Sequence, residues 1–241
     1  MIRFFAAQSD ISDGVIKLKA EDAAHIKSLR LRPAELFIVC DGEGSDYICR
    51  LGERGGGPTA EIVDTRLSSG EPSIACDVYI ALAKGDRLDY AVQKSVELGA
   101  MNVFLFQSER CVAMPGDMTK KTTRLRRIAL ETAKQCGRGR VPEVKSVDTL
   151  EAAVRQAACS QLPMFFYECE EKTRIKQILE ESRAPSVITI VTGPEGGFEQ
   201  FEVEMARSAG MHIVTLGPRI LRCETAPAAA LAAIMYHTGN L

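Results

Sequence analysis

Residues 193–198 read Gly-Pro-Glu-Gly-Gly-Phe, and residues 216–226 read Leu-Gly-Pro-Arg-Ile-Leu-Arg-Cys-Glu-Thr-Ala. Each loop follows a β-branched run too short for a buried helix, at residues 187–191 and 212–216. A helix is expected after each loop. In an open α/β sheet, ligands bind where loops leave the carboxyl ends of neighbouring strands. The two loops are therefore predicted to share one site.

The glycines and prolines of these loops indicate how such a site would bind. Gly196 and Gly197 allow a ligand to approach the main chain, while Pro194 and Pro218 stiffen the turns. The Gly-x-Gly-x-x-Gly spacing of a dinucleotide site is missing, as is the Gly-Lys-Ser/Thr loop of nucleotide triphosphatases. Either loop alone could be an ordinary strand-to-helix turn, but the pair favours a ligand site that uses backbone groups.

The chain upstream of these loops alternates strands with helices from residue 73 onward. Strands are predicted at 76–83, 103–106 and 164–167, and helices at 88–98, 122–135, 150–158 and 175–181. This alternation predicts an α/β domain over residues 73–241, with a mainly parallel sheet covered by helices on both faces.

Residues 1–70 read differently. Short strand-like runs at 4–6, 15–18, 36–40, 47–51 and 60–65 are separated by turn signals, with a short helix at 20–31. These features predict a small N-terminal β-barrel.

The net charge of −2 is unevenly distributed. Residues 120–140 hold eight basic residues and one acid, Glu131, which gives +7 and leaves −9 for the rest. In a helix over 122–135, Leu125, Ile128, Ala129 and Thr132 would face inward. A basic run is usually a solvated face, but this contrast favours a surface that contacts phosphates. Because the run has no aromatic residue, it would follow a backbone rather than read bases.

Composition excludes several other classes. No apolar run reaches the roughly 20 residues of a membrane span, and no signal peptide is legible, so a cytoplasmic protein is expected. The eight cysteines include no Cys-x-x-Cys pair, the three histidines are scattered, and no metal site or Ser-His-Asp triad is predicted. Arg219 and Arg222 would lower the pKa of the Cys223 thiol, which leaves a nucleophilic role for Cys223 as a minor alternative.

The residue pattern resembles the knotted-methyltransferase (SPOUT) superfamily, and within it the family that makes N3-methyluridine in 16S ribosomal RNA. The resemblance covers nearly the whole chain, and the paired C-terminal loops are its most specific part. It also includes KGDRLD at 84–89, QK at 93–94, ELG at 97–99, SER at 108–110, and Gln135 with Arg138.

This resemblance implies a deep trefoil knot in the C-terminal domain, made by threading the segment after Leu216 through a loop. It further implies a PUA-like RNA-binding domain at residues 1–70, a homodimer, and S-adenosylmethionine as cofactor. The cofactor-binding residues carried over are Gly193, Glu195, Gly197, Leu216, Gly217, Ile220, Leu221 and Ala226.

The implied reaction is an in-line methyl transfer to uridine N3, without a metal or a covalent intermediate. The N3 proton must leave, and the resulting charge spreads onto the flanking carbonyl oxygens, where a guanidinium would stabilise it. Arg222 is the first candidate and Arg138 or Arg110 the second, while Glu195 or Glu224 would accept the proton through a water. Alternatively, Arg222 pairs with Glu224 and Glu195 only caps the next helix.

The implied partner is 16S ribosomal RNA within the assembled 30S subunit, because a small barrel and one basic helix would read naked RNA poorly. The alternatives are a SPOUT enzyme that methylates a ribose or another base on transfer or 23S RNA, and a non-catalytic assembly factor. Two intact ligand loops argue against the latter. The residues predicted to contact RNA are Arg30, Arg32, Arg110, Lys120, Lys121, Arg124, Arg127, Arg138 and Arg140.

Overall fold

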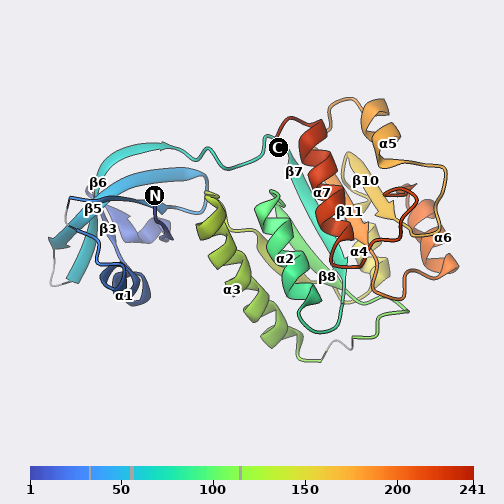
Figure 1. Cartoon of the computed structure of the whole chain (residues 1–241), viewed down its shortest axis with the longest axis horizontal. Coiled ribbons are helices and arrows are strands. Elements are labelled where there is room, and N and C mark those ends of the chain that lie inside the picture. The colour runs from blue at the N-terminus through green and yellow to red at the C-terminus, as the bar shows by residue number, and fades with distance from the viewer. Residues whose placement is uncertain (33, 55–56, 114–115) are drawn as a thin grey trace. The chain divides into compact units, whose positions relative to one another are not determined.

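A computed structural model describes residues 1–32, 34–54, 57–113 and 116–241. The chain separates into two compact units (Figure 1). The first comprises Met1–Glu71 and Ala133–Val141, and the second comprises Pro72–Thr132 and Pro142–Leu241. The first unit is therefore built from two separate stretches of chain.

The first unit is a curled six-stranded mixed sheet in the order β1-β4-β5-β6-β3-β2. Strands β1 and β4 are parallel and the other pairs are antiparallel. Phe4 and Phe37 are fully buried and meet edge to face at its centre. The elements are β1 (Arg3–Phe5), η1 (Gln8–Asp10), β2 (Ile11–Ser12), β3 (Val15–Lys17), α1 (Ala20–Ser28), β4 (Leu36–Cys40), β5 (Ser45–Arg54) and β6 (Gly57–Leu67).

A buried polar cluster ties the two stretches of the first unit together. The Arg3 guanidinium donates to both carboxylate oxygens of Asp46, at 2.6 and 2.9 Å, and Asp46 is fully buried. Arg3 also donates to the Arg138 carbonyl at 3.4 Å, and Arg138 donates to Glu71 Oε2 at 2.7 Å. Glu71 in turn accepts the backbone N–H of Gly139 at 2.9 Å. The cluster thus fixes the 133–141 segment to the strands through interior hydrogen bonds.

The second unit is an α/β layer built on six parallel strands in the order β12-β10-β11-β7-β8-β9. This confirms the predicted parallel sheet. Strand β11 (Val187–Thr192), in the middle of the sheet, is buried over five of its six residues, as expected for a strand covered on both faces. The strands are β7 (Ala75–Ala81), β8 (Asn102–Phe106), β9 (Glu143–Ser146), β10 (Leu162–Phe166), β11 (Val187–Thr192) and β12 (His212–Val214).

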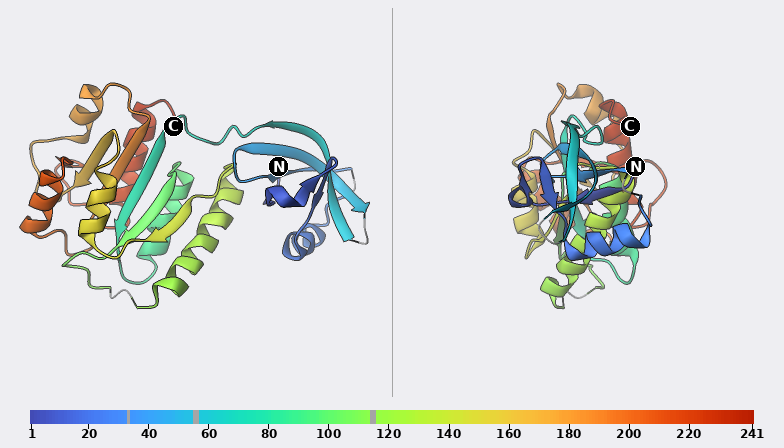
Figure 2. Two further views of the ribbon diagram at one scale, coloured as in Figure 1. Left: turned by 180° about the vertical axis from the view of Figure 1, so that it is seen from behind. Right: turned by 90° about the vertical axis from the view of Figure 1, so that its left-hand side faces the viewer.

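Helices cover both faces of this sheet, as predicted. Figure 1 shows α2 (Arg87–Glu97) and α7 (Ala226–His237) in front of the strands, and Figure 2 shows α4 (Leu150–Ala157) on the other side. Helix α6 (Gln200–Ser208) packs beside α4, and α5 (Ile175–Glu181) beside α7. None of the helices in the described ranges has the length and apolar character needed to cross a membrane.

The structure differs from the predicted elements at the start of the basic helix and at one edge strand of the sheet. Helix α3 (Met118–Cys136) begins four residues before the predicted start, and the Asp117 carboxylate accepts the Lys120 N–H at 3.0 Å. Of its expected inner face, Leu125, Ala129 and Thr132 are buried and Ile128 is half-buried. Strand β9 was not predicted, because only Val144 of its four residues is buried.

Candidate active site

The carboxyl ends of β10, β11 and β12 surround a cavity of about 470 Å³. Because the three strands are parallel and adjacent, the chain leaves all of them at the same edge of the sheet. The loop after β11 and the loop after β12 form two walls, and Phe166–Glu168 at the end of β10 forms a third. A volume of this size lies within the range of small-molecule sites.

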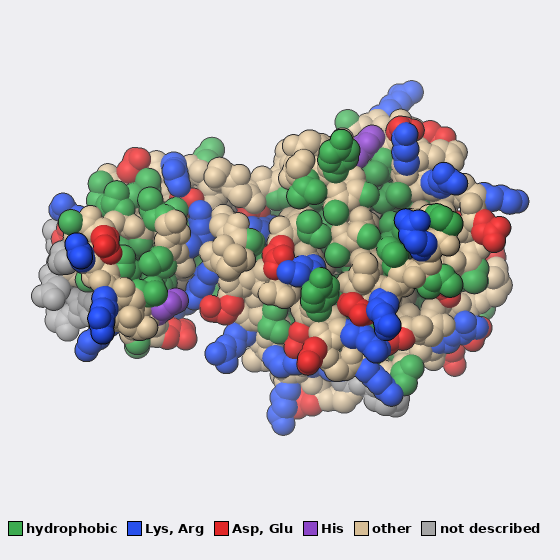
Figure 3. Space-filling view, in the orientation of Figure 1, with side chains coloured by type: hydrophobic (Ala, Val, Ile, Leu, Met, Phe, Trp, Pro, Cys, Tyr) green, Lys and Arg blue, Asp and Glu red, His purple; other side chains and the backbone are tan. Residues whose placement is uncertain are grey.

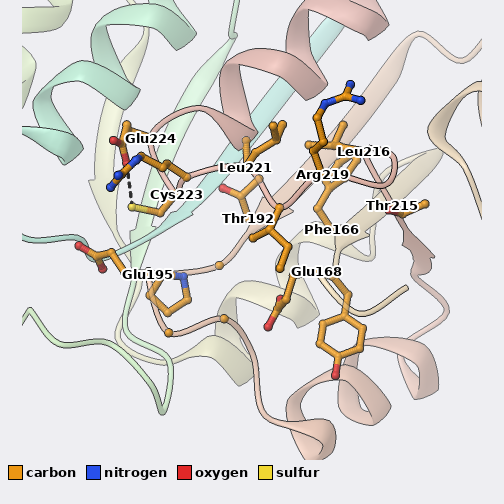
Figure 4. A pocket seen from close by; sticks show the side chains of 18 of the residues that line it. Phe166, Glu168, Thr192, Glu195, Thr215, Leu216, Arg219, Leu221, Cys223 and Glu224 are labelled. Carbon is orange, nitrogen blue, oxygen red and sulfur yellow. Dashed lines mark hydrogen bonds between the residues drawn. The ribbon is translucent and has the colours of Figure 1, made fainter. Parts of the chain in front are cut away.

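All eight residues predicted to bind the cofactor line this one cavity. They come from two loops that begin at residues 193 and 216, which the strand order of the sheet brings together. Figure 4 shows Glu195, Cys223 and Glu224 at one end of the cavity and Thr215 with Arg219 at the other. The eight residues are Gly193, Glu195, Gly197, Leu216, Gly217, Ile220, Leu221 and Ala226.

The loop after β11 has glycines where a side chain would collide with its supports. A Cβ on Gly193 would lie 2.9 Å from the Phe198 ring, which is buried against Phe165 with ring centroids 4.3 Å apart. Gly197 has φ +70°, and a Cβ there would lie 1.7 Å from the Glu168 carboxylate. That carboxylate accepts the backbone N–H of Phe198 at 3.2 Å. The loop is thus supported by the Phe198 ring and by the Glu168 carboxylate.

Glu195 connects this loop to the segment after β7. Its Oε1 atom accepts the backbone N–H of Lys84 at 3.0 Å and Nη1 of Arg87 at 2.7 Å. Burial opposes ionisation of Glu195, but these hydrogen bonds lower its pKa below the ordinary value. A carboxylate with a lowered pKa is a weak proton acceptor. The alternative that Glu195 caps the next helix is wrong, because Glu199 is the N-cap residue of α6 and forms a capping box with Glu202.

The cavity end beside Glu195 also holds the Cys223 thiol. Burial raises the pKa of Cys223 to about 12, with further increases from its hydrogen bond to Glu224 and from the charge of Glu195. The thiol donates to Glu224 Oε2 at 3.2 Å. A thiol that stays protonated at neutral pH is a poor nucleophile. The minor alternative of a nucleophilic Cys223 is therefore not supported.

The arginines proposed for charge stabilisation occupy three different environments. Arg222 lines the cavity and is exposed, and among the described residues no ion pair joins it to Glu224. Arg110 donates to Glu199 Oε1 at 2.7 Å and to the Gly196 carbonyl at 3.2 Å, so it braces the loop after β11.

Arg138 does not line the cavity. It is only 3 % exposed, and its Nη2 atom lies 2.7 Å from the Glu71 carboxylate in the first unit. Removing a buried guanidinium from such a pair would leave the acid uncompensated. We therefore assign Arg138 a structural role, in place of the predicted catalytic and RNA-binding roles.

The remaining residues predicted to contact RNA lie mainly on the surface. Lys121 is half-buried, and Arg140 donates to the Glu43 carbonyl at 2.9 Å. The exposed members are Arg30, Arg32, Arg110, Lys120, Arg124, Arg127 and Arg140.

Two groups of the cavity were missed in the sequence. Arg87 belongs to the KGDRLD run, but nothing in its spacing to Glu195 indicates that they meet, since 108 residues separate them. Glu168 follows a predicted strand directly, so its position at a strand end was a usable signal.

Comparisons with known proteins match this architecture. Residues 70–235 match the RNA methyltransferase domain family. The Ribosomal RNA small subunit methyltransferase E of Bacillus subtilis is 33 % identical over 230 residues, which cover 92 % of this chain and 90 % of that protein. This chain belongs to the ribosomal RNA small subunit methyltransferase E family.

Solved structures of similar proteins cover almost the entire chain. Ribosomal RNA small subunit methyltransferase E from Neisseria gonorrhoeae, bound to S-adenosylmethionine, is 32 % identical with a TM-score of 0.83, covering 98 % of this chain and 97 % of that one. A methyltransferase from Legionella pneumophila, also in complex with S-adenosylmethionine, is 26 % identical with a TM-score of 0.84 over the same shares. The two-unit fold is thus shared with methyltransferase E structures.

Proposed function

We propose that this protein binds S-adenosylmethionine and transfers its methyl group to N3 of a specific uridine in 16S ribosomal RNA. The observation that carries the proposal is the single cavity at the carboxyl ends of β10, β11 and β12, lined by all eight residues carried over as cofactor ligands. Relatives bound to S-adenosylmethionine support the cofactor, and membership of the methyltransferase E family supports the RNA.

The cavity suits this cofactor in size and chemistry. Gly193 and Gly217 bring main chain to its walls without an intervening side chain, and the backbone groups of Gly217 are held by Thr215 Oγ1. Leu216, Ile220 and Leu221 supply apolar surface for an adenine ring. The cofactor would bring an activated methyl group on a sulfonium, so the protein has only to orient the acceptor and remove its proton.

Charged groups of the cavity lining can assist the removal of the N3 proton. As N3 loses its proton, charge develops on the uracil carbonyl oxygens, and the exposed Arg222 guanidinium can donate to one of them. Glu224 is the better acceptor for the proton, through a water, because Glu195 accepts a main-chain N–H and the charged Arg87 guanidinium, whereas Glu224 accepts the neutral Cys223 thiol on Oε2.

The proposal extends to the architecture and the partners. After the edge strand β12, the chain returns to pack α7 against β11 and β7, which supports a trefoil knot after Leu216. The curled sheet supports a PUA-like RNA-binding domain at residues 1–70, and the proposed SPOUT domain at 73–241 contributes residues 133–141 to the compact unit of that sheet. Tyr236 on α7 is 76 % exposed beside small alanines, which supports a homodimer, and the assembled 30S subunit is the proposed substrate.

The reaction is tested by tritiated methyl transfer from S-adenosylmethionine to 30S subunits from cells that lack the endogenous enzyme. Nucleoside analysis should place the label in N3-methyluridine of 16S RNA. Transfer to another nucleoside would contradict the proposed specificity, and absence of cofactor binding would contradict the proposed function as a whole.

The role of Arg222 is tested separately with Arg222→Ala. We expect single-turnover methylation to fall about 100-fold or more, the usual effect of removing one donor to a developing oxyanion. Binding of S-adenosylmethionine should change little in the same variant. Unchanged methylation together with lost cofactor binding would make Arg222 a structural residue of the loop.

A further inference from the structure

A second cavity, of about 440 Å³, lies next to the cofactor cavity in the same unit. It is lined by Lys84 after β7 and by Lys121 and Arg124 in the first turns of α3. Among the described residues of its lining Asp86 is the only acid, and Leu88 and Val112 contribute apolar surface. The cavity therefore has an excess of positive charge.

Arg124 is held in place at this cavity by Asp89 on α2. Its Nη1 atom lies 2.6 Å from Asp89 Oδ2, while Oδ1 of Asp89 is buried without a hydrogen-bond partner among the described residues. A guanidinium carries five N–H donors, so one bond to Asp89 leaves donors for a ligand. The Arg124 side chain is 52 % exposed, which keeps those donors accessible.

The turn from Lys84 to Arg87 connects the linings of the two cavities. Lys84 lines the second cavity, and its backbone N–H donates to Glu195 of the cofactor cavity. Arg87, three residues on, lines the cofactor cavity itself. A ligand in the second cavity would thus lie beside the substrate of the first.

The lining points to one class of ligand. Lysine and arginine side chains from separate segments suit a phosphate, and the lining residues that the structure describes include no aromatic ring that could stack a base. On the face shown in Figure 3, Lys and Arg side chains lie among acids over the lower part of the larger unit, where α2 and α3 begin. We propose that the second cavity binds a backbone phosphate of the substrate RNA, next to the nucleotide that is methylated. This inference rests on the proposed function.

The test compares Lys84→Met and Lys121→Met with Lys176→Met as a charge-matched control. Lys176 lies on α5, and its side chain is 80 % exposed. Lys84→Met keeps the backbone N–H that Glu195 accepts. Binding to 30S subunits lacking the modification would be measured at several salt concentrations, with S-adenosylhomocysteine present, and S-adenosylmethionine affinity would be measured by calorimetry.

Each cavity variant should lower the slope of log affinity against log salt by about 0.7 to 1, the value for one lost phosphate contact. Near 0.1 M salt this corresponds to about five- to tenfold weaker binding. Lys84→Arg and Lys121→Arg should restore the slope, and Lys176→Met should keep it. Cofactor affinity should be the same in all variants.

The outcomes separate this inference from the proposed function. If the wild-type protein methylates 30S subunits but both cavity variants bind them as Lys176→Met does, the phosphate site is wrong and the function stands. If the cavity variants lose cofactor affinity as well, the lysines support the cofactor loop and the inference is again overturned. If the wild-type protein neither binds the cofactor nor transfers a methyl group, the proposed function itself fails.

Discussion

Replacing Gly197 by alanine should weaken S-adenosylmethionine binding by about 30- to 150-fold. Gly197 has φ +70°, a conformation that costs alanine about 1 kcal/mol or slightly more. The new Cβ would lie 1.7 Å from Glu168 Oε1, so the carboxylate must swing away and lose its bond to the Phe198 N–H. That bond contributes about 1 to 1.5 kcal/mol. Restoring the loop for binding therefore costs about 2 to 3 kcal/mol, which corresponds to the stated range.

Titration calorimetry on a double-mutant cycle tests this reasoning. Glu168→Ala loses the same hydrogen bond and should weaken binding about fivefold to tenfold. Because the bond can be lost only once, Gly197→Ala combined with Glu168→Ala should bind no more weakly than Gly197→Ala alone. Gly210→Ala is the control, since Gly210 has φ +87° with open space around a Cβ and lies outside the cavity. Additive effects, or wild-type affinity in Gly197→Ala, would refute the argument.

Two further predictions concern buried groups. Asp46→Asn should lower the free energy of unfolding at pH 7 by about 3 to 5 kcal/mol in urea titrations, because it leaves the Arg3 charge buried without a counterion. Burial opposes ionisation of Asp46, but hydrogen bonds from Arg3, Ser68 and Cys40 hold its pKa below the ordinary value. The stabilisation that the Asp46 carboxylate contributes to the folded state is therefore present above about pH 4, and it is lost as the pH falls through the folded-state pKa. Asp46→Asn should therefore flatten the acid limb of the stability curve, and an unchanged limb would contradict the assignment. The rate of methylation by Cys223→Ser should lie within about threefold of the wild-type rate. Iodoacetamide should modify Cys223 slowly at pH 8, because burial raises the pKa of its thiol to about 12. Rapid modification of Cys223 in the folded protein would contradict the protonated state of the thiol.

Much of the cofactor cavity could be predicted because parallel strands end at one edge of a sheet. The loops at 193–198 and 216–226 each follow a recognisable strand, so their meeting required only that β11 and β12 lie close together. The third wall depends on β10 lying between them, and strand order is set by packing that local pattern does not encode. The sequence could therefore place Glu168 at the end of a strand, but not against the loop at 193–198.

The role of Arg138 could not be predicted for a different reason. It belongs to a basic run whose other members are mostly exposed, and a guanidinium is usually at the surface. Its burial depends on Glu71, 67 residues earlier in the chain, which neutralises it. The charge pattern identifies the basic segment, but the contact with Glu71 that allows Arg138 to be buried depends on the tertiary structure.

The return of residues 133–141 to the first unit affects how this chain can be divided and recombined. A cut after residue 71 would separate the sheet from the Arg138 carbonyl that Arg3 binds and from the guanidinium that Glu71 neutralises. Exchange of the first unit between related proteins would have to transfer two stretches together, with matching acids and arginines in both. A single crossover between residues 71 and 133 would therefore join the two stretches of the N-terminal unit from different parents, whereas one after residue 141 would keep them together.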